Sequence, residues 1–206
     1  MIKGISGVVR PQLDQILIAD GGEDPKQEEA ALKNLISQNV DGIILQPARP
    51  DAAAYQFLAD AGIPVVLVDR LLRPLLFPCV TSNDTASGRI LAQAVLEKGY
   101  RSVLVISNPV DQATVRYERY RAFAAVCRDA DIPVTLLEVE EDGAVDGIAA
   151  WRDGIGANKP VIFAANGNLL MATLRWLQAN HVAVPDAVGL CGYDDWNWGG
   201  LANPPL

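Results

Sequence analysis

Four polar side chains in this sequence stand at or near the ends of apolar runs of strand length, and their types suit the binding of hydroxyl-rich molecules. Asp69, Asn166 and Asp194 each follow such a run closely, and Arg119 belongs to the polar region behind a fourth run. In an open parallel sheet, ligands bind beyond the carboxyl ends of the strands. Carboxylates, amides and guanidinium groups bind hydroxyls through paired hydrogen bonds. The sequence therefore predicts a site for a small polyhydroxylated ligand.

Aromatic side chains accompany the last of these strand ends. Tyr193, Trp196 and Trp198 flank Asp194, and their rings are suited to pack against the C–H face of a sugar. Each of these polar residues, taken alone, also fits a structural role as a turn former or helix cap. Only their repeated position at strand ends favours ligand binding over that alternative.

Other chemistries find little support in the residue pattern. The single histidine, His181, has no GxSxG or Cys/His partner motif, and neither GxxxxGK[ST] nor GxGxxG occurs. Residues 138–143 imitate the first half of a calcium loop, but Ala149 stands where the bidentate glutamate is required. We therefore expect no catalytic residue, no metal and no cofactor.

Composition narrows the class of partner. The chain has 206 residues, of which 50% are hydrophobic and 20% charged, and its formal net charge is -8. This acidic balance lacks the basic footprint of a surface that binds nucleic-acid phosphates. The three cysteines are isolated, and no signal segment or 18-residue apolar run is present, so we expect a soluble, cytoplasmic chain with no membrane contact.

Strands and helices alternate in the predicted order, which indicates parallel sheets flanked by helices, an α/β fold. The 42–45 run is continuously apolar, as expected of a strand covered on both faces. Asp84 is the predicted N-terminal cap of the helix at 84–98. After a helical tail at 1–9, the first series comprises strand 15–19, helix 26–38, strand 42–45, helix 51–61, strand 63–68 and strand 79–81. The second comprises helix 84–98, strand 102–106, helix 114–128, strand 134–139, helix 144–154, strand 160–164, helix 169–180 and strand 187–191. Two series indicate two lobes, 1–83 and 84–206, the first of them incomplete.

Several segments resemble the effector-binding core of the lactose-repressor (LacI/GalR) family of bacterial transcription regulators. In family order they are QNVDGIILQP, GIPVVLVDR, TSNDTASG, RYERYRAF, FAANGNLLMATLRWL, VPDAVGLCGYDDWNW and NPPL. The resemblance implies two Rossmann-like lobes of the periplasmic-binding-protein-like I type, with a small effector held in the cleft between them. It also implies a chain truncated at both ends, because the family's first strand and last segments have no counterpart here.

The resemblance assigns effector-binding roles to particular positions. Asp69 in LVDR corresponds to the carboxylate of the first lobe, and Arg119, Asn166 and Asp194 correspond to the ligand-binding residues of the second. Further candidate contacts are Arg70, Arg116 and Trp196. The three arginines together make a sugar acid an alternative to a neutral sugar as the effector. The family's usual AND triplet is Ala-Asn-Gly here, and an acidic turn replaces a usual aromatic around Asp142.

The implied function is that of an effector-sensing domain without catalysis, in a homodimer that binds operator DNA through a helix-turn-helix domain absent from this chain. A sugar or sugar acid would be the effector. A periplasmic sugar-binding protein of a transport system is the alternative, because it shares the fold and several motifs. An enzyme on the same fold is a third reading, since fold alone does not fix function.

Overall fold

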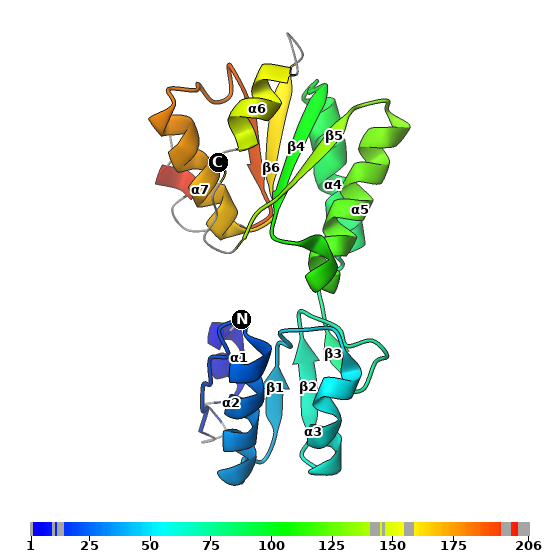
Figure 1. Cartoon of the computed structure of the whole chain (residues 1–206), viewed down its shortest axis with the longest axis vertical. Helices are drawn as coiled ribbons and strands as arrows, with labels where there is room; N and C mark the ends of the chain where they lie inside the picture. Colours follow the sequence, from blue (N-terminus) through cyan, green and yellow to red (C-terminus); the bar gives the residue numbers. More distant parts are fainter. Residues whose placement is uncertain are drawn as a thin grey trace. The chain divides into compact units, whose positions relative to one another are not determined.

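The structure is a computed structural model of the whole chain, and it describes residues 2–9, 11, 15–140, 145, 147–154, 159–194 and 199–201. The chain divides into two compact units, 1–80 and 81–206 (Figure 1). Each unit contains one parallel sheet with helices packed against it. The lobe boundary predicted from the sequence lies close to this division, and the assignment of the units as two lobes of one binding domain stays a prediction.

The first unit is a small three-stranded sheet with helices on one face. The sheet has the order β1-β2-β3, and both pairs are parallel, with Ile43 opposite Val65 and Leu67 opposite Cys79. In chain order the elements are α1 (Ile2–Val9), α2 (Pro25–Ser37), β1 (Ile43–Leu45), a 3-10 helix (Ala52–Tyr55), α3 (Gln56–Asp60), β2 (Val65–Val68) and β3 (Cys79–Val80). The predicted strands and helices from 26 to 81 are confirmed within a few residues at each end.

Helix α2 begins where the sequence places a strong start signal. The side chain of Asp24 accepts hydrogen bonds from the backbone N–H groups of Lys26, at 2.7 Å, and Gln27, at 3.3 Å. Pro25 occupies the first helical position, where its missing N–H costs nothing. The helix then buries Leu32 against the sheet. Local capping and one apolar face are therefore sufficient to place this helix.

Replacing Asp24 with alanine is expected to lower the thermal midpoint at pH 7. The N–H groups of Lys26 and Gln27 hold the pKa of Asp24 below its ordinary value. A group with a lowered folded-state pKa stabilises the fold above its unfolded pKa, about pH 4, and this stabilisation is lost as the pH falls through the folded pKa. The difference between variant and wild type, measured by circular dichroism, should therefore shrink below about pH 4.

The matched control is Asp41→Ala, which removes an exposed aspartate outside the helices. It should leave the thermal midpoint nearly unchanged both at pH 7 and at pH 3. A difference for Asp24→Ala that is equally large at pH 7 and at pH 3 would show that its carboxylate does not act through the charged cap.

One face of the first sheet is exposed, which contradicts the prediction that the 42–45 strand is covered on both faces. Ile43 and Leu45 are buried, whereas Ile44 between them is 53% exposed. Its neighbour Val66 is 40% exposed and Val80 on the edge strand 67%. Successive side chains of a strand point to opposite faces, and the described helices of this unit supply buried residues to one face only. A continuously apolar sequence is therefore not sufficient evidence that both faces of this strand are buried.

The predicted strand at 15–19 was wrong. This segment has no regular secondary structure, and Leu17 and Ile18 are 53% and 68% exposed. A strand needs a hydrogen-bonded neighbour, and among the described residues β1 pairs only with β2. The segment leads instead into a turn, in which Gly22 N–H donates to Asp20 and the Asp24 N–H to the Gly21 carbonyl. Apolar composition alone does not make a strand.

The second unit is a larger four-stranded sheet of order β5-β4-β6-β7, in which all pairs are parallel. Its elements are α4 (Asp84–Glu97), β4 (Ser102–Ser107), a 3-10 helix (Val110–Gln112), α5 (Thr114–Asp129), β5 (Val134–Glu138), α6 (Gly147–Gly154), β6 (Pro160–Ala164), α7 (Gly167–Ala179), β7 (Gly189–Gly192) and a 3-10 helix (Gly199–Leu201). Every helix and strand predicted from 84 onward is confirmed. None of the described helices has both the length and the apolar character needed to cross a membrane.

Helices cover both faces of this second sheet. On β4, Leu104 and Ile106 contribute to a core cluster with residues of α6 and α7, whereas Val103 and Val105 contribute to one with residues of α4 and α5. Figure 1 shows α4 and α5 on one side of the sheet and α6 and α7 on the other. Strand β4 is buried along its whole length. Because all strands of this sheet are parallel, their carboxyl ends lie at one edge, and the candidate site residues of the second unit lie near that edge.

The cysteines behave as packing residues. All three are free thiols, and Cys127 is fully buried. Burial raises the pKa of Cys127 to about 11 and that of Cys191 to about 12. Thiols with raised pKa values are poor nucleophiles at neutral pH, because the thiolate is the reactive form. These two residues therefore fill the core of the second unit.

Candidate functional site

In the first unit, two polar side chains follow neighbouring strands. Asp69 comes directly after β2 and Gln46 directly after β1. The Gln46 amide donates to a carboxylate oxygen of Asp69 at 2.8 Å, which fixes both side chains. Asp69 has φ of +68°, a left-handed conformation that is uncommon for a residue other than glycine. The pair offers the second carboxylate oxygen of Asp69 and the amide oxygen of Gln46 as hydrogen-bond acceptors.

Arg70, a predicted ligand contact, is engaged inside the protein. The residue is 8% exposed, and its guanidinium forms an ion pair with Glu23 and donates to the Pro47 carbonyl at 3.3 Å. These bonds tie together the segments that precede α2, follow β1 and follow β2. The observed role is the fixing of the loops around Asp69, and its contact with a ligand stays a prediction.

In the second unit, Arg119 and Asp84 form a buried ion pair. The Arg119 Nε donates to Asp84 Oδ1 at 2.7 Å, and the side chains are 14% and 6% exposed. Asp84 also accepts from the Ser82 hydroxyl at 2.9 Å. A terminal nitrogen of Arg119 lies 3.5 Å from the Ala165 carbonyl oxygen at the end of β6. The guanidinium is therefore held close to the carboxyl ends of the strands.

Asp84 does not cap α4, contrary to the prediction. The cap is the preceding residue, Asn83, whose side chain accepts from the Ala86 N–H at 3.0 Å. A cap residue stands just before the first helical residue, and Asp84 is itself the first residue of α4. Its carboxylate is consequently free of the capping role and turns to Arg119.

The aromatic ring of Tyr193 packs against the guanidinium group of Arg119. The Arg119 carbon Cζ lies 3.9 Å from the centre of the tyrosine ring, within the range of a cation–π interaction. The Tyr193 hydroxyl contacts the Ser87 hydroxyl and lies 3.4 Å from Asp84. Burial raises the pKa of Tyr193. The sequence predicted that this ring stacks on a sugar, but one face is occupied by Arg119.

Asn166 and Asp194 meet at the N-terminus of α7. Asn166 accepts from the Leu169 N–H at 2.9 Å as the cap of the helix, and it donates to Asn108 at 2.9 Å. Asp194 accepts from the Gly167 N–H at 2.8 Å. The structural role of a helix cap, considered for these residues from the sequence, is therefore present. Asp194 is exposed, and its other oxygen is not engaged by this bond.

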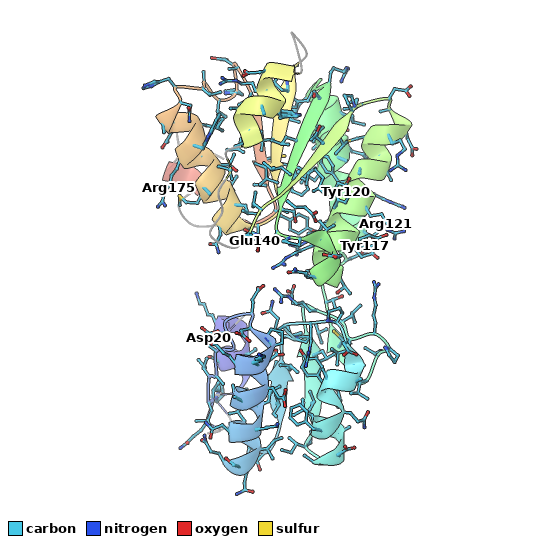
Figure 2. The ribbon with its side chains drawn as sticks, viewed as in Figure 1. Asp20, Tyr117, Tyr120, Arg121, Glu140 and Arg175 are labelled. Carbon is cyan, nitrogen blue, oxygen red and sulfur yellow. The ribbon has the colours of Figure 1, made fainter. Side chains whose placement is uncertain are left out.

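The remaining predicted contacts are placed only in part. Arg116 is half-buried on α5 and has an interaction partner within the protein. Trp196, Trp198 and Asp142 lie outside the described residues. Glu140, labelled in Figure 2, lies just after β5 and is exposed. The structure thus brings together Arg119, Asn166 and Asp194 as neighbours of one sheet edge in the second unit.

Three residues of these networks were not assigned to the site by the sequence analysis. Gln46 has the same signal as Asp69, a polar residue directly after an apolar strand, and that rule would have found it. Glu23 and Asp84 have no such signal, because their partners Arg70 and Arg119 lie 47 and 35 residues away. The arrangement as a whole provides carboxylates, amides and one oriented guanidinium, which hydrogen-bond hydroxyl groups.

Each of the two α/β units contains a parallel sheet whose strands are followed by hydrogen-bonding side chains. Residues 8–197 match the family described as periplasmic binding protein domain. The chain therefore belongs to that family, and the resemblance to lactose-repressor-type regulators is confirmed.

Similar proteins include regulators and a transport component. The probable HTH-type transcriptional regulator EndR of Paenibacillus polymyxa is 28% identical over 197 residues, covering 93% of this chain and 58% of that protein. A periplasmic binding protein/LacI transcriptional regulator from Alkaliphilus metalliredigens QYMF, complexed with D-xylulofuranose, has a TM-score of 0.81 at 22% identity, covering 99% of this chain and 77% of that one. The periplasmic component of the arabinose ABC transporter from Shewanella sp. ANA-3 has a TM-score of 0.79 at 18% identity, covering 94% and 68%. The two structures support the fold alone, and this chain spans only 58% of EndR and 62% of the KdgR regulator of Bacillus subtilis.

Proposed function

We propose that this chain is the ligand-sensing domain of a bacterial transcription regulator and that it binds a small sugar or sugar derivative without chemical conversion. The observation that carries the proposal is the set of hydrogen-bonding side chains at strand ends, Asp69 with Gln46 in the first unit and Arg119 with Asp194 in the second. The relatives described above, which are regulators by name, support a sensing role.

The proposed mechanism is a shift between conformations of the regulator. A ligand that contacts Asp69, Arg119, Asn166 and Asp194 in only one conformation would stabilise that conformation over the others. By linkage, the affinity for operator DNA then changes, typically by about 1–3 kcal/mol. DNA binding would require a domain outside this chain, and we propose a cytoplasmic homodimer as the working assembly.

A transport-type sugar-binding protein is the second candidate, because the chain belongs to the family described as periplasmic binding protein domain. Both candidates predict sugar binding and differ only in what the bound protein acts on. The relatives named above as regulators make the sensing role the better supported one.

A bound sugar is expected to raise the thermal midpoint of the chain by several degrees. A ligand at 100 times its dissociation constant adds about 2.7 kcal/mol to stability, and for a chain of this size each kcal/mol corresponds to about 2–4 °C. Asp194→Asn should weaken that ligand about 10- to 100-fold, because a charge-assisted hydrogen bond is lost while an oxygen remains to cap α7. The measurement is a thermal-shift panel of sugars, followed by calorimetric titration.

Asp186→Asn is the control, since Asp186 is an exposed aspartate in the turn before β7. It should leave both the thermal midpoint and the affinity unchanged. If no sugar of the panel raises the midpoint, or if Asp194→Asn binds as tightly as wild type, the assignment of the site fails.

A further inference from the structure

Each positive group of the candidate site whose partner is known already faces a carboxylate of the protein. The guanidinium of Arg119 is paired with Asp84, and that of Arg70 is paired with Glu23. The N-terminus of α7, which carries the positive end of a helix dipole, donates the Gly167 N–H to the carboxylate of Asp194. Two of the three arginines that suggested a sugar acid in the sequence analysis, Arg70 and Arg119, are therefore each paired with a carboxylate of the protein.

Two carboxylates of the candidate site also carry a negative charge that no ion pair among the described residues offsets. Asp69 is hydrogen-bonded by the neutral amide of Gln46, and its negative charge is not cancelled by that bond. Asp194 is exposed and touches a backbone N–H of α7. Like charges repel across short distances, so an anionic group placed beside either carboxylate raises the energy of the complex.

We propose that the ligand of this site is an uncharged, hydroxyl-rich molecule of sugar size, and that sugars bearing a carboxylate or phosphate bind more weakly. The inference rests on the function proposed above and narrows its ligand class. A hydroxyl group both donates and accepts hydrogen bonds, so it satisfies a carboxylate and a guanidinium in the same site. A carboxylate or phosphate ligand only accepts, and beside Asp69 in the first unit or beside Asp194 in the second it would meet a like charge.

Side-on capture of an anion, through Nε and a terminal nitrogen of Arg119, would also require a change in the buried ion pair. The Nε of Arg119 is committed to Asp84, and the ring of Tyr193 packs on the guanidinium at 3.9 Å. Pulling the arginine away would leave Asp84, which is 6% exposed, as a buried carboxylate without its cation. A ligand that accepts a hydrogen bond from a terminal nitrogen leaves Nε on Asp84, but there an anion meets a guanidinium whose charge is already balanced in part by Asp84.

The inference is tested with matched ligands on the full chain. Isothermal titration at constant ionic strength would compare glucose with glucuronate, galactose with galacturonate, and ribose with ribose 5-phosphate. We expect the neutral member of at least one pair to bind, and to bind about tenfold or more tightly than its anionic partner. Asp84→Asn removes the counter-charge of Arg119. It should reduce the ratio of the affinity for the neutral sugar to that for its anionic partner at least about threefold.

Glu97→Gln is the matched control, because it removes one exposed carboxylate from the other end of the same helix α4. It should leave the ratio unchanged. If circular dichroism shows that Asp84→Asn does not fold, Glu23→Gln removes the counter-charge of Arg70 instead and should narrow the ratio in the same direction. The comparison of ligands on the wild-type chain does not depend on either variant.

The possible failures are distinct. An anionic member that binds as tightly as its neutral partner, or more tightly, overturns the inference and leaves a sugar-binding function in place. Absence of binding for every member of the three pairs and for the sugar panel overturns the proposed function and this inference together.

Discussion

Replacing Arg119 with alanine is expected to lower the free energy of unfolding of the second unit by about 3 kcal/mol. The loss follows from the burial of its partner, because Asp84 is 6% exposed and would keep its charge without the cation. The stacking on Tyr193 would be lost as well. Urea unfolding followed by circular dichroism measures the change, and the same variant should lose ligand binding.

Arg121→Ala is the control on the same helix. Arg121 is paired with Glu118, but its side chain is 58% exposed, and such surface pairs contribute little to stability. Figure 2 shows it on α5 beside Tyr117. Asp84→Asn in the Arg119→Ala background removes the unpaired charge and should recover part of the loss. Equal stability of Arg119→Ala and Arg121→Ala would refute a buried ion pair.

Replacing Phe163 with alanine is expected to lower the free energy of unfolding by about 3–5 kcal/mol. Phe163 lies on β6 with none of its surface exposed, and its ring stacks on Phe123 with centroids 4.8 Å apart. The truncation removes buried apolar surface and leaves a cavity that a close-packed core fills only in part. Urea unfolding would measure the loss, and Ile90→Ala, which truncates a side chain that is 66% exposed on α4, should change stability by less than about 0.5 kcal/mol.

The same substitution should also weaken ligand binding, because Phe163 supports the site from the core. Its ring centroid lies 6.5 Å from that of Tyr193, which in turn packs on the guanidinium of Arg119. We expect affinity to fall even under conditions in which Phe163→Ala remains folded. Unchanged affinity in a folded, destabilised variant would show that the position of Tyr193 does not depend on this packing.

The second unit was predictable from sequence because its signals are local and agree with one another. Its helices carry apolar faces with the helical period, and its strands are apolar runs of the right length between them. The first unit was less predictable. Residues 15–19 have strand composition but lack a pairing partner among the described residues, and a pairing partner is a property of the tertiary structure.

The candidate site was also predictable from the sequence only in part. Sequence position placed Asp69, Asn166 and Asp194 at strand ends, since parallel strands bring their carboxyl ends to one edge. It did not reveal that Asn166 and Asp194 both serve the N-terminus of α7. A residue type that suits a ligand suits a helix terminus equally well, and only the fold shows which partner is within reach.

The amino-acid sequence by itself determined the order of strands and helices in the second unit, the α/β class and the family, because periodicity, caps and motifs are written in neighbouring residues. Tertiary structure alone decided how the charges are paired. Arg119 meets Asp84 across 35 residues and Arg70 meets Glu23 across 47. Electrostatic partnership depends on distance in space and on burial, neither of which follows from separation along the chain.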